Sequence, residues 1–576
     1  MDTSEICDIL TRIGNLLEIQ GENVFKIRAY HKAAENLAAS GEDINLIFAQ
    51  GRLREMPGIG PAIADKISEL LTTGKLEFLE KLEAEVPPSL LEVIKIPGIG
   101  PKKAAMFWKE AKITTVLELE NAARAGKLRT LPGMGEKSEA KLLENLALYR
   151  TLSARMTLAE ASRQGARWLE WLRQQPGVTH AEIAGSLRRW RDTVGDLDLV
   201  ASTDQPTFLV NQFILHPKVV TILSQGENKA SVALSSGVKI QLWIQPDESF
   251  GALLQYATGS KYHNVALREI ARQRGYSLNE RGLTSEEGVL LACSDEETVY
   301  HKLSLPWIPP ELREDRGEIK AAQEDRLPLL VNVSDQRAEL HTHSTWSDGV
   351  ESIASIAKLA ISRGLKLLAI TDHSGGLGVA GGLSITRLLQ QREEIHALRR
   401  EVGDRLVLLQ GAEVEIRPDG SLDYPDEILA ELDIVIASLH YSLSQPREVI
   451  TSRLLNAIRN PHVDIIGHPS GRLLPRRAGA DLDYEQILEA AREHHTGLEI
   501  NASPYRLDLT DIYARRAGEM GIPLAVNTDA HSPADFDQAV YGYSVARRAW
   551  LTASQVINTW QPDQIVEWLK TRVRPS

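Results

Sequence analysis

The sequence predicts a multidomain protein of the α+β and α/β classes, with a helical N-terminal region, a mixed middle region and a C-terminal distorted (β/α) barrel. Three observations lead to this prediction: the length of 576 residues, a glycine motif that occurs three times before residue 137, and short apolar segments that alternate with helical ones after residue 338. Because a domain holds about 100 to 200 residues, this length corresponds to about three to five domains.

The composition excludes several classes of protein. No apolar run approaches the roughly 18 residues needed to span a bilayer, and the first residues, Met1–Glu5, are acidic where a signal peptide is basic and then apolar. We therefore expect a cytoplasmic protein with no membrane contact. Two cysteines, Cys7 and Cys293, are too few for a disulfide framework or a thiolate zinc site, so any metal must be held by His, Asp and Glu.

The net charge of −13 argues at first against a nucleic-acid partner, because phosphate binding needs a basic surface. The charge is unevenly distributed, however, since residues 321–576 carry nine of the thirteen net negative charges. The first 320 residues are nearly neutral and can still present a local basic face.

The N-terminal region contains three copies of a motif with two glycines: Met56–Pro61, Ile96–Pro101 and Leu131–Glu136. Each copy lies between helical patterns, which predicts a helix, a tight turn and a second helix. Glycine permits positive φ in the turn, and the free N–H groups that begin the second helix can bind phosphate. The pattern resembles the helix-hairpin-helix motif, which holds the DNA backbone without reading sequence; a plain turn between helices is the alternative. The expected DNA-binding glycines are Gly58, Gly60, Gly98, Gly100, Gly133 and Gly135.

The middle region, with strand-like segments at 181–184, 197–200 and 238–244, combines two features typical of nucleotide binding. Strand alternation places the carboxylates of Asp196 and Asp198 on one face, where they can share divalent cations. Ten residues upstream, Gly185-Ser186 precedes a helix and offers N–H and hydroxyl donors to a triphosphate, with Arg188 or Arg189 to balance its charge. An Asp-x-Asp pattern alone usually lies on the solvated surface. The prediction of nucleotide binding therefore depends on its combination with the upstream Gly185-Ser186 turn.

Residues 1 to about 315 resemble a family X DNA polymerase of the beta-like repair class, and the segment Tyr256–Asn264 strengthens the resemblance. The resemblance implies Mg²⁺ or Mn²⁺ at a palm site with Asp196 and Asp198 as catalytic residues, deoxynucleoside triphosphates as substrates, and gapped or nicked DNA as the partner. The nucleotide-binding residues that it implies are Gly185, Ser186, Arg189, Gly195, Tyr256, Asn264 and Arg268.

The resemblance also matches Lys26, Tyr30 and Lys66 to positions that bind a DNA 5′-phosphate. Lys66 either forms a Schiff base with an abasic sugar or makes one more phosphate contact. The domains expected are a lyase-like helical domain with the first hairpin (1–85), a fingers-like domain with two hairpins (86–150), a palm (151–245), a thumb (246–315), a polar linker (316–337) and a phosphoesterase domain (338–576).

Gln241 departs from the family pattern, which has a third aspartate on a neighbouring strand at this position. The neutral amide can neither neutralise a divalent ion nor accept a proton from the primer 3′-hydroxyl at pH 7. Asp247 lies six residues further on, roughly 20 Å along an extended strand, and cannot replace it. We therefore predict nucleotide and gap binding with weak or absent synthesis.

The C-terminal region contains nine N/O-type metal-ligand candidates, eight of them at or just beyond predicted strand ends. Imidazole and carboxylate groups in such a cluster suit Zn²⁺, Mn²⁺ or Fe²⁺ with bridging water. A lone His after a strand is usually a core or surface residue, but nine such positions in series are not explained that way. They are His341, His343, Asp348, His373, Glu413, His440, His468, Asp529 and His531.

The order of these residues resembles the polymerase and histidinol phosphatase (PHP) domain, whose trinuclear metal site has matching residue types at all nine positions. The resemblance implies three divalent metals and metal-dependent phosphoester hydrolysis, such as a 3′–5′ exonuclease. Glu415, Asp372 and Asn501 are candidates for orienting the ligands or for ordinary structural roles, and Arg472 and Arg506 for steering DNA phosphates.

Three functions remain open from the sequence. The first is a bifunctional repair enzyme that fills gaps and has an exonuclease; the second is a repair nuclease on a catalytically reduced polymerase frame, which Gln241 favours. The third is a small-molecule phosphatase of the histidinol phosphatase kind, against which the three hairpin motifs argue. A non-enzymatic adaptor would leave nine metal-type residues without a role. We expect a monomer.

Overall fold

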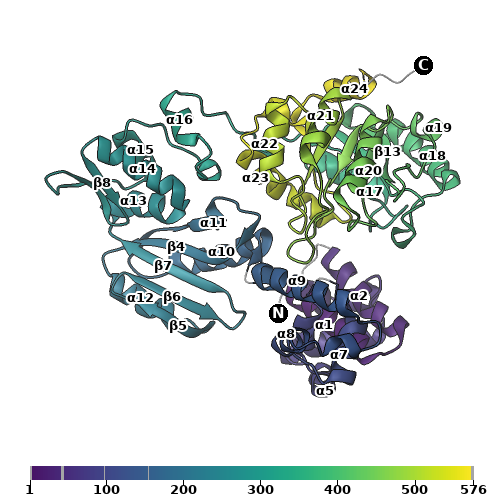
Figure 1. The fold of residues 1–576 in the computed structure, drawn as a ribbon, viewed down its shortest axis with the longest axis horizontal. Helices are drawn as coiled ribbons and strands as arrows, with labels where there is room; N and C mark the ends of the chain where they lie inside the picture. Colours follow the sequence, from purple (N-terminus) through teal and green to yellow (C-terminus); the bar gives the residue numbers. More distant parts are fainter. Residues whose placement is uncertain (1–2, 40–43, 97, 154, 572–576) are drawn as a thin grey trace.

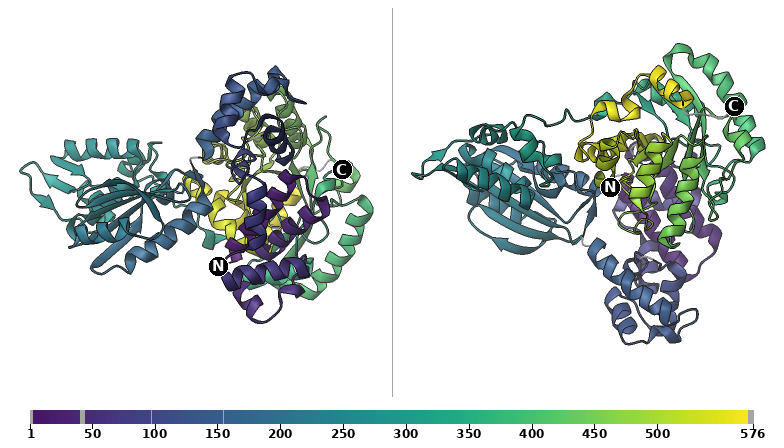
Figure 2. Two further views of the ribbon diagram at one scale, coloured as in Figure 1. Left: turned by 90° about the horizontal axis from the view of Figure 1, so that it is seen from below. Right: turned by 45° about the horizontal axis from the view of Figure 1, so that its top comes forward.

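The computed structural model describes residues 3–39, 44–96, 98–153 and 155–571. They form three bodies (Figure 1): a helical N-terminal region, a mixed α/β body and a C-terminal barrel. The mixed body lies to one side, and the helical region and the barrel lie on the other, as the two further views in Figure 2 also show. Within the described ranges, none of the helices is both long enough and apolar enough to cross a membrane.

The N-terminal region is entirely helical and has one hydrophobic core. In the turns of the three repeated motifs, Gly58, Gly98 and Gly133 have φ values of 78°, 81° and 71°, and α4, α7 and α9 begin directly after the motifs' second glycines. The predicted helix–turn–helix geometry is therefore confirmed. The helices are α1 (Thr3–Gln20), α2 (Val24–Ala39), α3 (Ile44–Ala49), α4 (Pro61–Thr73), α5 (Glu77–Glu85), α6 (Leu90–Val93), α7 (Pro101–Ala111), α8 (Val116–Arg124) and α9 (Glu136–Ser153).

The palm is a five-stranded sheet in the order β2-β4-β7-β6-β5, with β4 and β7 parallel. Leu197 and Leu199 of β4 pack with Trp168 of α10 and Phe213 of α12, so the alternate residues Asp196 and Asp198 face the other side. The elements are β1 (Met156–Thr157), α10 (Leu158–Arg173), β2 (Val178–Ile183), α11 (Gly185–Arg188), β3 (Thr193–Val194), β4 (Asp196–Thr203), α12 (Pro206–Ile214), β5 (Val219–Gln225), β6 (Lys229–Leu234) and β7 (Lys239–Gln245).

The thumb follows directly and pairs a three-stranded antiparallel sheet with helices. Its elements are α13 (Asp247–Thr258), α14 (Lys261–Gln273), β8 (Tyr276–Asn279), β9 (Gly282–Ser285), β10 (Leu290–Leu291) and α15 (Glu296–Lys302).

The polar stretch 309–337, of which residues 316–337 are expected to form a linker, is ordered and packed. It forms α16 (Glu318–Gln323) and two 3-10 turns, Pro310–Leu312 and Val333–Asp335. The fully buried Arg313 pairs with Glu296 of α15 at 2.6 Å, and this contact anchors the stretch on the thumb. A buried ion pair between residues 17 positions apart leaves no periodic pattern in the sequence, so sequence periodicity does not predict that this stretch is ordered.

The C-terminal region is a barrel of seven parallel strands in sequence order, and a further bridge between Thr342 and Ala530 brings its two edges together. β13 extends through Glu413, so this ligand candidate lies within a strand and not at or just beyond its end. The strands are β11 (Ala338–Glu339), β12 (Leu367–Ile370), β13 (Val407–Glu415), β14 (Ile434–Ser438), β15 (Ile465–Gly467), β16 (Gly497–Asn501) and β17 (Leu524–Asn527). The helices are α17 (Ile353–Ser362), α18 (Ile385–Val402), α19 (Asp426–Leu429), α20 (Arg447–Arg459), α21 (Tyr484–Glu493), α22 (Asp511–Glu519), α23 (Ala539–Arg548) and α24 (Pro562–Thr571).

Ion pairs join the barrel to the palm and to the ordered stretch after the thumb. Arg472 of the barrel lies 3.2 Å from Asp192 of the palm, and Arg316 lies 2.8 Å from Asp511 of α22. Arg548 of α23 donates to the carbonyl of Arg189 at 2.7 Å. These contacts therefore join the parts of the chain that carry the two sites described next.

Candidate metal centre and palm site

The nine predicted metal-ligand residues meet at one end of the barrel. Because parallel strands all point the same way, the segments that follow them converge at their carboxyl ends. Eight of the nine residues fall into three overlapping groups whose ligand atoms lie within 4.8 Å of one another: His343, Asp348, His373 and His531; His341, His343, Glu413 and Asp529; and His373, Glu413 and His440. The ninth, His468, places its Nε2 2.9 Å from Glu413 Oε1.

Glu413 is the centre of this cluster. Its Oε2 lies 2.8 Å from His373 Nδ1 and 3.4 Å from His341 Nε2, and its Oε1 lies 3.4 Å from His440 Nε2. Glu413 lies within β13, so the hydrogen-bonded strand fixes the position of its carboxylate. One carboxylate facing five imidazoles can bridge neighbouring cations.

The hydrogen bonding of the buried nitrogen and oxygen atoms in the cluster indicates whether these residues suit a metal. Four buried atoms of the cluster form no hydrogen bond within the described part of the chain: His341 Nε2, His343 Nδ1, His468 Nδ1 and Glu413 Oε2, the last of which has only its ion-pair contacts with the imidazoles. Buried polar atoms are almost always paired, so this concentration of unpaired ligand atoms suggests bound cations. Imidazole with carboxylate suits Zn²⁺, Mn²⁺ or Fe²⁺.

The histidines of the cluster differ in pKa because their electrostatic surroundings differ. Burial lowers the pKa of His343 to about 3, with the neighbouring His531 and His373 acting in the same direction. Burial opposes charge on His531 too, but its hydrogen bond to Asp348 and the charge of Asp529 raise its pKa to about 9. His343 is thus neutral near pH 7, as a metal-binding imidazole must be, whereas His531 would have to lose a proton when it binds a metal.

A ring of buried polar groups orients the ligands. His440 Nδ1 lies 2.6 Å from Glu415 Oε2, and Asn501 donates to Asp529 at 3.1 Å. Asp372 accepts from the backbone N–H of Ser344 at 2.8 Å. The three residues expected near the ligands therefore contact either a ligand or a loop that carries ligands.

Two carboxylates of this ring were missed from the sequence. Glu499 lies 2.7 Å from His341 Nδ1 and accepts from the backbone of His468, and Glu339 accepts from Thr528 Oγ1 at 2.9 Å. Burial raises the pKa of Glu339 to about 7. The signal was a carboxylate inside an otherwise buried strand, since charged residues are almost never fully buried without a partner.

We expect Glu499→Gln to weaken metal binding about 10- to 100-fold, because the substitution removes the negative charge beside His341 Nδ1 and replaces one of the two acceptor oxygens with a donor. Competition with a chelator, read as bound metal per chain, measures the effect. Glu493→Gln, at an exposed position of α21, is the matched control and should leave metal binding unchanged. Equal affinity of both variants would contradict this role for Glu499.

The palm site brings together the carboxylates of Asp196 and Asp198 and the amide of Gln241. Asp198 Cα pairs with Gln241 Cα in the parallel β4–β7 register, and Gln241 Nε2 donates to Asp196 Oδ2 at 2.9 Å. Gly185, with φ of 63°, lies so close to Asp198 that a Cβ on it would fall 2.0 Å from Oδ2. Only glycine is therefore accommodated at this turn.

Asp247 lies at the other end of the same sheet. It accepts from Ser202 at 2.5 Å and from Thr179 at 2.6 Å, and these hydrogen bonds lower its pKa to about 2. Because Ser202 is six residues along β4 from Asp196, Asp247 does not reach the palm carboxylates, as predicted.

Burial, with the nearby Asp196 carboxylate, raises the pKa of Asp198 to about 7. A protonated carboxyl does not hold a cation, so we expect the palm to bind Mn²⁺ with a nucleoside triphosphate about tenfold more weakly at pH 6 than at pH 8. Calorimetric titration across this range measures the effect. Asp198→Asn is the control for the nucleotide's own titration, and an equal pH dependence in this variant would contradict the assignment.

The other residues expected to bind nucleotide contact the thumb or one another. Arg189 donates to Glu314 at 3.1 Å and to the carbonyl of Thr258. The Asn264 side chain is buried and donates to the carbonyl of Tyr256 at 2.7 Å, and Arg268 donates to the carbonyl of Asn264. Ser186 lies in α11 and Gly195 directly precedes β4, beside the palm carboxylates.

Lys26, Tyr30 and Lys66, the expected 5′-phosphate residues, gather around the ring of Phe78. The Lys66 and Lys26 ammonium groups lie 4.7 and 5.7 Å from its centroid, and Tyr30 stacks on it at 6.2 Å. Burial raises the pKa of Tyr30 to about 12. The structure thus places all three in one patch on the helical region.

Comparison with known proteins identifies the regions separately. Residues 1–76 match the helix-hairpin-helix domain, residues 90–147 a SAM-like helix-hairpin-helix tandem, residues 253–314 the DNA polymerase beta thumb and residues 339–503 the PHP domain.

Curated relatives cover the whole chain or its C-terminal part. "DNA polymerase/3'-5' exonuclease PolX" of Bacillus subtilis is 39% identical over 573 residues, 99% of this chain and 100% of the relative. A "probable phosphatase" of Thermoanaerobacter sp. is 35% identical over 248 residues, which cover 41% of this chain and 95% of that protein. A "probable phosphatase" of Shewanella sediminis is 30% identical over 41% of this chain and 91% of its own length.

Proposed function

Because the chain belongs to the PolX family, the family X DNA polymerases that also carry a PHP domain, we propose that it is a DNA repair enzyme that binds gapped DNA and trims 3′ ends at the barrel. The polymerase module binds DNA and a nucleotide but synthesises weakly, since Gln241 stands where the family has a catalytic aspartate. The proposal includes a cytoplasmic location, three divalent cations in the barrel and Mg²⁺ or Mn²⁺ at the palm. It also includes gapped or nicked DNA and deoxynucleoside triphosphates as the ligands of a monomer.

The observation that carries this proposal is the position of Glu413 among five imidazoles. Glu413 and the eight other ligand residues would hold the cations, which would supply Lewis-acid activation of the scissile phosphate and of the attacking water. Glu499 and Glu415 keep His341 and His440 oriented. Arg506 Nε lies 3.7 Å from Asp529 Oδ2 and offers a guanidinium to a phosphate at the same edge.

The division of labour is tested with a 5′-labelled primer on a one-nucleotide-gapped duplex. Incubation with Mn²⁺ or Mg²⁺, with and without nucleotides, is read on a denaturing gel. Shortened products, even with nucleotides present, and their loss on chelation would support the proposal. Extension at a rate typical of the family would overturn the part that concerns Gln241.

A small-molecule phosphatase is the second candidate, because "probable phosphatases" align with 41% of the chain. It predicts faster turnover of a small phosphomonoester than of DNA, so histidinol phosphate is assayed in parallel with the labelled primer. The helix-hairpin-helix and thumb regions favour DNA.

A further inference from the structure

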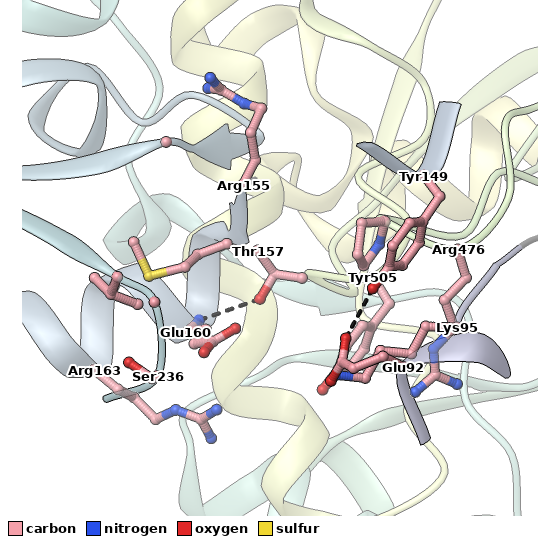
Figure 3. A pocket seen from close by; sticks show the side chains of 15 residues that line it. Glu92, Lys95, Tyr149, Arg155, Thr157, Glu160, Arg163, Ser236, Arg476 and Tyr505 are labelled. Atoms are coloured by element: carbon pink, nitrogen blue, oxygen red, sulfur yellow. Dashed lines mark hydrogen bonds and ion pairs between the residues drawn. The ribbon is translucent and has the colours of Figure 1, made fainter. Parts of the chain in front are cut away.

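A crevice of about 510 Å³ lies where the helical region, the palm and the barrel meet (Figure 3). Its lining includes Lys95 and Tyr149 from the helical region, Arg163 and Gly195 from the palm, and Arg476 and Tyr505 from the barrel. Figure 3 shows Lys95, Tyr149, Arg476 and Tyr505 gathered on one wall and Arg163 on the other. The volume lies within the range of ligand-binding pockets, roughly 300 to 1,000 Å³.

The charged residues that line the crevice are mainly basic, although the chain as a whole has a net negative charge. Four lining residues are basic and two, Glu92 and Glu160, are acidic, in a protein of net charge −13. Arg155 donates to Thr193 and is committed to the palm. Neither Arg163 nor Arg476 forms an ion pair within the described ranges, and both are exposed. The crevice therefore offers two uncommitted guanidinium groups to an anion.

Two tyrosines add aromatic surface. The Tyr505 side chain is 52% exposed on the barrel wall, and the Tyr149 hydroxyl is held by Glu92 at 2.8 Å. A basic groove with aromatic rings is the combination that binds single-stranded nucleic acid without sequence preference, because every base can stack and every phosphate carries charge.

The crevice is lined by residues that adjoin both sites in the chain. Tyr505 precedes Arg506, which contacts Asp529 of the metal centre, and Arg472 donates to the Arg506 carbonyl while it pairs with Asp192 of the palm. At its other side the crevice is lined by Gly195, which directly precedes Asp196. The lining thus includes the residue that precedes Asp196 of the palm and the residue that precedes Arg506, which contacts the metal centre.

We propose that this crevice binds single-stranded DNA and holds the unpaired 3′ strand between the palm and the barrel's metal centre. The inference rests on the proposed nuclease function and adds the path of the strand. Arg163 and Arg476 neutralise phosphates, and Tyr505 stacks with a base.

The test compares the double variant Tyr505→Ala/Arg476→Ala with the intact protein and with Arg400→Ala, which removes an exposed charge from α18. Hydrolysis of a primer with three unpaired 3′ nucleotides should fall at least tenfold in kcat/KM in the double variant and stay unchanged in the control. Hydrolysis of bis(4-nitrophenyl) phosphate, which is too small to need the crevice, should be equal in all three proteins. The single variant Tyr505→Phe, with Arg476 intact, should keep most of the activity that the double variant loses, because the aromatic ring remains.

A direct readout is photo-crosslinking of an oligonucleotide with 5-iododeoxyuridine near its 3′ end, for which we expect Tyr505 or Tyr149 in the crosslinked peptide. Equal DNA hydrolysis by the double variant and the intact protein would overturn the inference. So would a crosslink that a free deoxynucleoside triphosphate abolishes while a longer oligonucleotide does not, since the crevice would then be a nucleotide site. Failure of the intact protein to cleave either substrate would instead overturn the proposed nuclease function.

Discussion

Glu413→Gln is expected to lower the metal-dependent exonuclease rate by at least about 1,000-fold, which corresponds to about 4 kcal/mol in the activation barrier. Glu413 alone faces both His373 at 2.8 Å and His468 at 2.9 Å from opposite oxygens of one carboxylate. Glutamine preserves the shape but removes the negative charge and replaces one acceptor oxygen with a donor. Initial rates of primer shortening in Mn²⁺ measure the effect.

Two controls separate this result from misfolding and from the palm. Glu427→Gln makes the same change at an exposed position of α19 and should leave the rate unchanged. Asp198→Asn removes a palm carboxylate and should also leave shortening of an unpaired 3′ end unchanged. An exonuclease that survives Glu413→Gln with bound metal unchanged would place the hydrolytic site elsewhere.

The sequence was sufficient to predict the architecture because each region repeats a local signal. The three glycine turns require positive φ at Gly58, Gly98 and Gly133, and the strands of the barrel are buried apolar runs between helices. It was also sufficient to find the nine metal-type residues, because strand ends in a parallel barrel converge.

The remaining features depend on contacts between distant residues. A carboxylate in a buried strand marks Glu499 and Glu339 as unusual, but only the folded structure shows that their partners are His341 and Thr528. The anchor of the stretch after Pro309 is the buried Arg313–Glu296 pair. Such pairings are set by tertiary packing, and neither strand alternation nor helical periodicity encodes them.

Gln241→Asp is expected to increase primer extension on gapped DNA by about 100-fold or more. The parallel register sets the new carboxylate opposite Asp198, where it adds the missing negative charge and proton acceptor for the 3′-hydroxyl. It also removes the amide that donates to Asp196 Oδ2. The assay uses the Glu413→Gln background, so that products are not degraded as they form.

Gln245→Asp is the matched control, because it makes the same change four residues along the same face of β7, opposite Ser202. It should leave extension unchanged. Without metal, three carboxylates close together repel one another, so Gln241→Asp should also lower the thermal midpoint in chelator and regain it with Mn²⁺. A gain in metal-dependent stability without a gain in extension would mean that Gln241 is not what limits synthesis. Extension by the parent protein that is already rapid and equal to that of Gln241→Asp would show that the amide supports catalysis as it stands.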